Sequence, residues 1–169
     1  MTALEGDAGM TGVARRYGAG VVLMHLRGEP ATMQERPEYG DVVAEVTAAL
    51  SARVSALKQA GLDPESLVLD PGIGFGKTAD HNVALLARLG MLAALGRPVL
   101  VGVSRKRFIG LITGRDAEQR MAGSLACAVW AAARGARVWR VHDVKESVDA
   151  ARLVAALNRE TAEWTGAIR

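Results

Sequence analysis

Several common features are scarce or missing in this sequence of 169 residues. A single cysteine, Cys127, excludes a disulfide framework and a zinc site built from several cysteines. No run of about 18 uncharged apolar residues is present, so we expect no membrane span. Residues 1–10 lack the basic, apolar and small-residue succession of a signal peptide. We therefore expect a cytoplasmic protein in which Cys127 is a core residue of an apolar helix.

Aromatic residues make up only 4% of the chain, and no dense basic run contains them. The net charge is nevertheless +3, and arginine supplies 17 of the 21 basic residues. A nucleic-acid surface typically combines a basic patch with stacking aromatics, so we expect no nucleic-acid partner. The charge fits a small anionic ligand, and it fits a plain arginine-rich bias equally well.

Short β-branched runs alternate with longer segments of helical periodicity. The predicted strands are residues 21–25, 66–70, 98–103 and 137–142. The predicted helices are residues 8–17, 41–60, 82–95, 116–134 and a last helix that begins at Asp143. This alternation predicts an α/β fold with parallel strands, and strands that are apolar on both faces predict burial on both. Four such units predict one domain over residues 1–169 that forms half of a (β/α)₈ barrel, with a small open sheet as the alternative.

Polar and charged residues gather directly after each predicted strand, where βα proteins bind their ligands. Asp70 ends the second strand and suits the N–H edge of a guanidine-like ligand; capping of its own loop is the alternative. Ser104 and Lys106 follow the third strand. Arg140 and His142 lie two apart in the fourth predicted strand, so they would share one face and suit a pyrophosphate. A core histidine beside a surface arginine is the alternative there.

Three glycines before Lys77 and Thr78 invite a nucleotide-binding interpretation. The P-loop spacing needs a glycine at position 71, which is Pro71, and the dinucleotide spacing from Gly72 needs one at position 77. Neither motif is present. We therefore expect Gly72, Gly74 and Gly76 to form a tight turn or to let a ligand approach the backbone closely.

Four segments at the predicted strand ends together resemble one family, the dihydropteroate synthases. They are Leu23–Gly28, Asp70–Thr78, Val101–Lys106 and Arg140–Val144. Their order and spacing follow the family over nearly the whole chain. The resemblance implies a (β/α)₈ barrel of folate biosynthesis that joins p-aminobenzoate to 6-hydroxymethyl-7,8-dihydropterin pyrophosphate and releases pyrophosphate.

The resemblance also implies a role for each matching residue. Asp70 would bind the amino and ring N–H edge of the pterin. Lys106 would hydrogen-bond the pterin ring and border the p-aminobenzoate site, while Arg140 would stack on the pterin and hold the pyrophosphate with His142. Lys106, Arg140 and His142 form the implied catalytic set. The other implied substrate-binding residues are Met24 and Gly102 at the pterin, Phe75 at the p-aminobenzoate ring, and Ser104.

The chain departs from the family in two ways. Thr2–Asp7 resembles the stretch after the family's fourth barrel strand, so we expect the first four strands to be absent and this chain alone to be inactive. Mg²⁺ is the implied cofactor, with its protein ligand in that absent half and no metal ligand in this chain. Arg107 stands where many members carry a serine that contacts the p-aminobenzoate carboxylate. The family also often dimerises, and residues 116–158 are apolar enough to allow it.

Two alternatives stay open beside the synthase. A half-barrel would expose two strand edges and apolar surface, so the chain could be a non-catalytic fragment that binds a partner or itself. A pterin-binding methyltransferase domain is the other alternative, and the run Ser104-Arg105-Lys106 argues against it.

Overall fold

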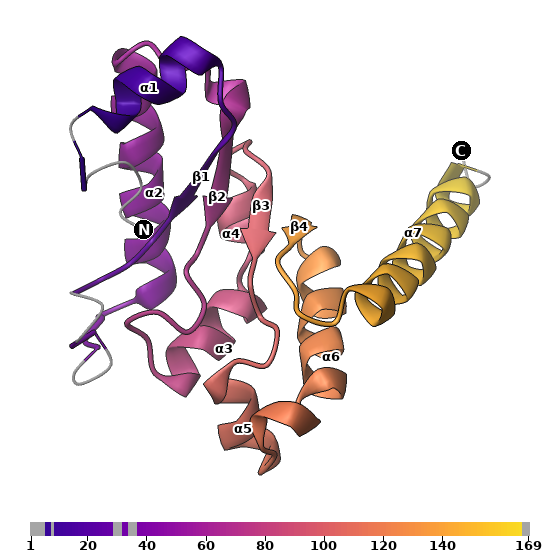
Figure 1. Ribbon diagram of the computed structural model, residues 1–169. Coiled ribbons are helices and arrows are strands. Elements are labelled where there is room, and N and C mark those ends of the chain that lie inside the picture. Colours follow the sequence, from indigo (N-terminus) through magenta and orange to yellow (C-terminus); the bar gives the residue numbers. More distant parts are fainter. Residues whose placement is uncertain (1–5, 8, 29–31, 34–36, 167–169) are drawn as a thin grey trace.

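The computed structural model of this protein describes residues 6–7, 9–28, 32–33 and 37–166. Helices and strands alternate along it (Figure 1). The α-helices are α1 Met10–Tyr17, α2 Val42–Gln59, α3 Ala79–Ala87, α4 Gly90–Ala93, α5 Arg107–Thr113, α6 Met121–Ala132 and α7 Val144–Gly166, with short 3₁₀ turns η1 Pro64–Ser66 and η2 Ala117–Gln119. The strands are β1 Val21–Met24, β2 Leu67–Asp70, β3 Val99–Val101 and β4 Ala136–Trp139. The expectation built on Thr2–Asp7 falls mostly outside the described residues.

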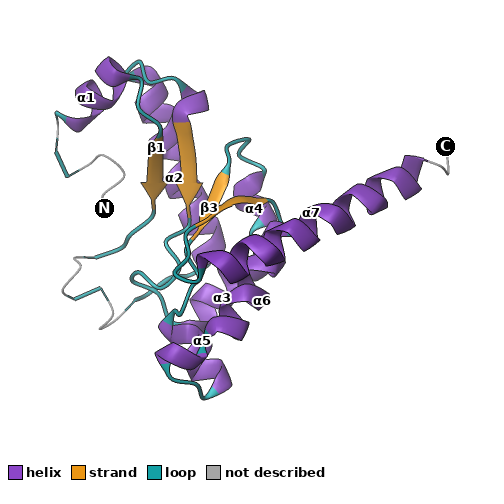
Figure 2. Cartoon of the chain, turned by 45° about the vertical axis from the view of Figure 1, so that its right-hand side comes forward, coloured by secondary structure: helices purple, strands orange, loops and turns teal. Residues whose placement is uncertain are grey.

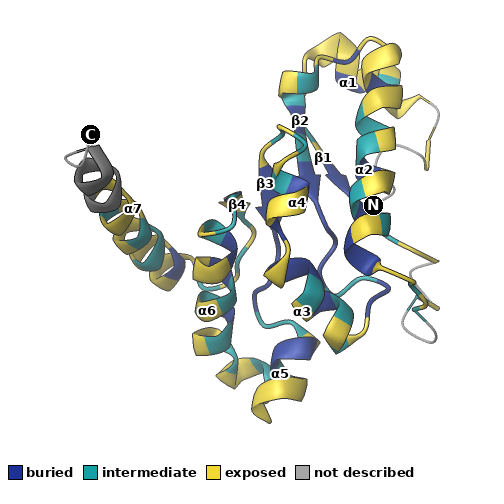
Figure 3. Cartoon of the chain, turned by 180° about the vertical axis from the view of Figure 1, so that it is seen from behind, coloured by how far each residue is buried: buried dark blue, intermediate teal, exposed yellow. Residues whose placement is uncertain are grey.

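The strands form one parallel sheet in the order β1-β2-β3-β4, which is their order in the sequence. Helix α4 lies behind β3 in Figure 1 and in front of it in Figure 3, seen from behind, while α2 lies alongside β1 and α3 follows at the carboxyl ends of the strands. This arrangement confirms the predicted α/β class. Four parallel strand–helix units with their helices on one side make up half of a (β/α)₈ barrel.

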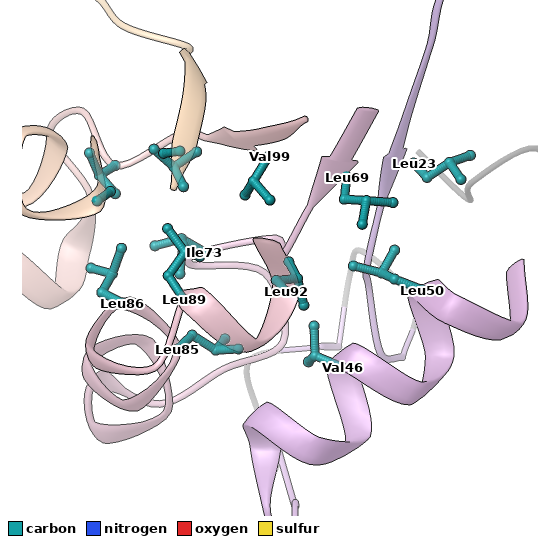
Figure 4. Packing of buried hydrophobic residues seen from close by; sticks show 14 of the residues in the cluster. Leu23, Val46, Leu50, Leu69, Ile73, Leu85, Leu86, Leu89, Leu92 and Val99 are labelled. Carbon is teal, nitrogen blue, oxygen red and sulfur yellow. The ribbon is translucent and has the colours of Figure 1, made fainter. Parts of the chain in front are cut away.

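One face of the sheet packs against the helices and forms the core. Leu23, Leu69 and Val99 are fully buried there; Leu69 and Leu23 lie toward Leu50 of α2, and Val99 lies toward Ile73 (Figure 4). The helix positions follow local signals in the sequence. The Asp41 side chain caps the first turn of α2, accepting hydrogen bonds from the backbone N–H groups of residues 43 and 44, and the chain turns away after α2 at a glycine with positive φ.

On the opposite face of the sheet, side chains of the two edge strands, β1 and β4, are exposed. This differs from the prediction that the strands are buried on both faces. Val22 of β1 is 44% exposed and Val138 of β4 is 39% exposed. Each side chain points away from the helix-covered core, because successive side chains of a strand point to opposite faces. Helix α7 contacts α6 at its start and then projects away from the rest of the chain (Figures 1 and 2). No described helix is long and apolar enough to cross a membrane.

The structure corrects three element boundaries. The predicted helix 82–95 is two helices, since α3 begins at Ala79, where Thr78 and His81 form a capping box, and α4 follows after a break. The predicted helix 116–134 starts only at Met121, because the preceding segment forms η2. The predicted strand 137–142 ends at Trp139. Helix α5 was not predicted at all.

Candidate active site at the carboxyl ends of the strands

Asp70 ends β2 and is the most deeply buried charged group of the site, with 0% exposure. Its Oδ1 accepts a hydrogen bond of 2.8 Å from the Gly72 backbone N–H, so one oxygen caps the following loop. Its Oδ2 lies 3.1 Å from Arg140 Nη2 but has no well-aligned hydrogen-bond donor among the described residues. Burial raises the pKa of this carboxyl, against the opposing influence of Gly72 and Arg140. The second oxygen can therefore serve a ligand while the first holds the loop.

Arg140 and His142 lie in the loop after β4, so their expected place on one strand face is wrong. The Arg140 backbone N–H still continues the sheet by donating to the Val101 carbonyl over 3.0 Å. The Arg140 guanidinium packs over Gly102, where an added Cβ would lie 2.6 Å from Nη2. A side chain at position 102 would therefore displace the Arg140 guanidinium from its present place beside Asp70.

Ser104 connects the ends of β3 and β4. It is 5% exposed, and its Oγ lies 2.9 Å from Nδ1 of His142 and accepts a 3.2 Å hydrogen bond from the His142 backbone N–H. The His142 side chain itself is exposed. An imidazole held at one ring nitrogen can present its other nitrogen to a ligand.

Lys106 lies on the other side of the same space. Its Nζ is 3.9 Å from the centroid of the Phe75 ring, and its stem passes close to Gly74. Burial lowers the pKa of Lys106, and the nearby charge of Arg140 lowers it further, while Asp70 opposes the shift. A cavity of about 320 Å³ lies between these groups; it is lined by Phe75, Gly102, Ser104, Lys106, Arg140, Val141 and His142.

The structure thus brings together nearly all the residues expected at the site. Six of the eight expected residues line this one cavity, and Asp70 lies against Arg140 at its edge. Met24 is 5% exposed and is the register partner of Asp70 across β1 and β2, so its side chain lies beside the carboxylate on the same face of the sheet, next to the residues that line this cavity. A second cavity of about 480 Å³ continues past Lys106 between the 74–79 loop and α5, where Arg107 lines it.

A buried lysine beside the site was not expected from the sequence. Lys77 is 3% exposed, donates from Nζ to the Phe75 carbonyl over 3.0 Å, and lies 3.1 Å from Nδ1 of His25. Burial, with the charges of Lys77 and Arg27, lowers the pKa of His25 to about 4, so a neutral His25 can accept from the ammonium. Burial lowers the pKa of Lys77 itself to about 8. The pair ties the glycine loop to the end of β1.

A second missed feature lies between Ser104 and Lys106. Arg105 has a φ of 56°, and it is the one non-glycine residue with positive φ in the described part of the chain. Its guanidinium binds the Asp143 carboxylate through Nε at 3.2 Å and through Nη2. The sequence holds no local signal for this conformation, because a residue with a bulky side chain adopts it only when outside contacts hold it there.

Comparison with known proteins agrees with this geometry. Residues 1–142 match the family described as "Pterin binding enzyme". The dihydropteroate synthase of Escherichia coli (strain K12) is 49% identical over 150 residues, which are 89% of this chain and 53% of that protein. That of Neisseria meningitidis serogroup C is 45% identical over 159 residues, covering 93% of this chain and 56% of that protein. The chain therefore spans about half the length of these curated relatives.

Solved structures resemble the fold closely. Dihydropteroate synthase from Thermus thermophilus in complex with 6HMPPP superposes with a TM-score of 0.87 at 47% identity, over 93% of this chain and 62% of that one. The enzyme from Xanthomonas albilineans in complex with 7,8-dihydropteroate gives a TM-score of 0.85 at 46% identity, over 93% of this chain and 55% of that one.

Proposed function

Because this chain belongs to the pterin binding enzyme family, we propose that it carries half of a dihydropteroate synthase site, the half at the carboxyl ends of β1 to β4. The reaction is the joining of p-aminobenzoate to 6-hydroxymethyl-7,8-dihydropterin pyrophosphate in folate biosynthesis. The observation that carries the proposal is Asp70 Oδ2, a buried acceptor without an aligned donor among the described residues, beside a cavity lined by Lys106, Arg140 and His142. A pterin offers adjacent N–H donors to such a carboxylate, and its pyrophosphate offers negative charge to the cations.

The pterin would bind at Asp70. Its amino and ring N–H groups would donate to the carboxylate, and Lys106 would donate to the ring from the opposite side. Arg140, which now makes its ion pair with Asp70 at 3.1 Å, would leave Oδ2 to the pterin and stack on the ring. Gly102 and Met24 would line the slot. A guanidinium that is 47% exposed can make this exchange because solvent already reaches it.

Two groups would hold the pyrophosphate and stabilise its departure. The aniline nitrogen of p-aminobenzoate attacks the methylene carbon, the C–O bond breaks, and the C–O electron pair leaves with pyrophosphate; the aniline loses one proton. Negative charge grows on the leaving oxygen, so Arg140 and His142 would lower the barrier, with Ser104 fixing the His142 ring. Phe75 would pack against the p-aminobenzoate ring next to Lys106, which positions the two reactants.

Mg²⁺ enters the proposal only as the cofactor that the resemblance to dihydropteroate synthases implies. The described residues hold no group of three His, Cys, Asp or Glu side chains that could bind a metal ion. We therefore assign no step of the reaction to a metal held by these residues.

Calorimetric titration of the 169-residue chain with the pterin pyrophosphate, after size-exclusion chromatography, tests the proposal. We expect binding that Asp70→Asn and Lys106→Ala each weaken by about 10-fold or more, because each removes a hydrogen bond to a charged group. Asp149→Asn, which changes an exposed carboxylate on α7, is the matched control and should bind as the unaltered chain does. Absence of binding by a folded, monodisperse chain would refute the proposal.

Self-association is a second candidate function, and the open sheet face favours it. Val22 and Val138 are exposed at the two edges, and Leu153 on α7 is 67% exposed. A homodimer in the cytoplasm, without nucleic acid or membrane, is the form of the protein that we propose. Light scattering after size exclusion measures it directly: a mass of one chain at micromolar concentration would contradict the dimer.

The named relatives support the synthase over a pterin-binding methyltransferase domain. Both the Escherichia coli and the Neisseria meningitidis proteins carry the name dihydropteroate synthase. A methyl-transfer assay with methyltetrahydrofolate would be expected to give no product.

A further inference from the structure

Arg105 combines a strained backbone with contacts to three residues from two parts of the fold, the start of α6 and the loop after β4. Its φ of 56° lies in the left-handed region, which residues with a Cβ adopt only when outside contacts hold them there. Its backbone N–H donates to Ser124 Oγ of α6 over 2.8 Å, and its carbonyl accepts from Arg120 Nη1 over 3.2 Å. Ser124 is 6% exposed and itself donates to the Arg120 carbonyl, so this support is rigid.

The side chain of Arg105 makes the third contact. Nε donates to Asp143 Oδ2 over 3.2 Å, and Nη2 donates to Oδ1, so the guanidinium and the carboxylate meet in a bidentate pair. The Asp143 side chain is only 14% exposed. The hydrogen bond from Arg105 lowers the pKa of Asp143, so the pair stays ionised at neutral pH.

These contacts place Arg105 between two residues of the candidate site. Ser104, before it, holds His142, and Lys106, after it, lies over Phe75. Two consecutive residues after β3 are therefore paired with two consecutive residues after β4: Ser104 with His142, and Arg105 with Asp143. The left-handed turn at Arg105 lets Ser104 face β4 while Lys106 turns toward the glycine loop.

We propose that Arg105 is a positioning residue, which touches no substrate itself and holds His142 beside Arg140 at the spacing that the pyrophosphate requires. The ion pair to Asp143 fixes the β4 loop, and the left-handed backbone fixes the β3 loop. This inference deepens the proposed function and rests on it.

Binding of two separate probes distinguishes positioning from plain stability. Inorganic pyrophosphate reports on the Arg140–His142 end, and 6-hydroxymethylpterin without a phosphate reports on the Asp70 end. Arg105→Ala and Asp143→Asn should each weaken pyrophosphate binding by about 10-fold, within the range of couplings between contacting residues, and pterin binding by less than about 2-fold. A merely structural role would lower both affinities together or neither.

A glycine variant separates the backbone from the ion pair. Arg105→Gly loses the guanidinium but adopts the same φ without strain, so its thermal midpoint should exceed that of Arg105→Ala while its pyrophosphate affinity stays low. The matched control is Arg88→Ala. Arg88 also forms a bidentate pair, with Asp41 at 2.9 and 3.0 Å, but outside the cavity lining, so this variant should bind both probes normally.

The outcomes separate the positioning role from the proposed function. If the unaltered chain binds pyrophosphate and both Arg105→Ala and Asp143→Asn bind it within about 2-fold of the unaltered chain, the positioning role is refuted and the proposed function stands. If the unaltered chain binds neither probe, the proposed function is refuted and the inference with it. Equal losses for both probes would also refute positioning, because they would indicate general loosening of the fold.

Discussion

Replacing Gly72 by alanine should lower the stability of the fold far more than the same change at Gly96. Gly72 has a φ of +68°, and a Cβ built there would lie 1.9 Å from the His25 carbonyl oxygen. Real Cβ contacts are essentially never shorter than 3.0 Å, so the two backbone segments must move apart by about 1 Å. Neither yields easily, because the His25 N–H donates to the Asp70 carbonyl and the Gly72 N–H donates to Asp70 Oδ1.

The expected loss follows from two contributions. An alanine in the left-handed region costs about 1–2 kcal/mol. Loss of the buried hydrogen bond from Gly72 to the Asp70 carboxylate costs about 1.5–3 kcal/mol more, since the acceptor is charged. Together these give a decrease of about 2.5–5 kcal/mol in the free energy of unfolding.

Gly96→Ala is the matched control for this change. Gly96 has a φ of +73°, but no atom lies within 4 Å of the added Cβ, so only the backbone contribution of about 1–2 kcal/mol remains. Urea unfolding followed by far-ultraviolet circular dichroism gives both values. Losses that agree within about 0.5 kcal/mol would refute the reasoning, because the contact with His25 would then contribute nothing. A Gly72→Ala chain that fails to fold beside a folded Gly96→Ala chain would support it.

Burial and charge elsewhere set three further expectations. Burial beside Lys77 lowers the pKa of His25 from 6.5 to about 4; the unfolded chain therefore takes up this proton first, and the free energy of unfolding should fall from about pH 6.5 to 4. His25→Gln should flatten that slope in urea titrations, and an unchanged slope would contradict the assignment. Burial lowers the pKa of Lys77 from 10.5 to about 8, so the free energy of unfolding should rise as the pH is raised from about 8 to 10.5. A Lys77→Met chain that still shows this rise would exclude Lys77 as its source. Leu57→Ala, at 1% exposure, should cost about 2–5 kcal/mol, whereas Leu111→Ala, at 61% exposure, should change stability by less than about 0.5 kcal/mol; comparable urea midpoints for the two would contradict the burial pattern.

The elements that local signals define were predicted well. Helix α2 lies within one residue of its expected bounds, because Asp41 caps its start and Gly61 follows its end. Helix α5 was missed because its seven residues are too few to show a clear apolar period, and Gly110 interrupts them. The fourth strand was predicted too long, since Val141 continues the apolar alternation that the backbone abandons after Trp139.

The charged residues of the candidate site were predicted from one topological rule, whereas Met24, Phe75 and Gly102 were expected only from the family resemblance. Parallel strands end at the same edge of a sheet, so Asp70, Lys106 and Arg140 could be expected to meet although they are far apart in the sequence. The supports of the site could not be predicted in that way. The pairs Lys77–His25 and Arg105–Asp143 depend on burial and on a left-handed backbone, which arise only after the loops pack.

The order of the strands has a consequence for how the chain folds. Each strand pairs with the strand that precedes it in the sequence, so the sheet can grow one strand–helix unit at a time as the chain emerges from the ribosome. Most contacts of the site join adjacent units. The Asp70–Arg140 ion pair joins the ends of β2 and β4 across β3, so it closes a long loop and forms only once the fourth unit has docked. A ribosome-arrested chain that stops before β4 should therefore form its β1–β2–β3 core without the ion pair between Asp70 and Arg140.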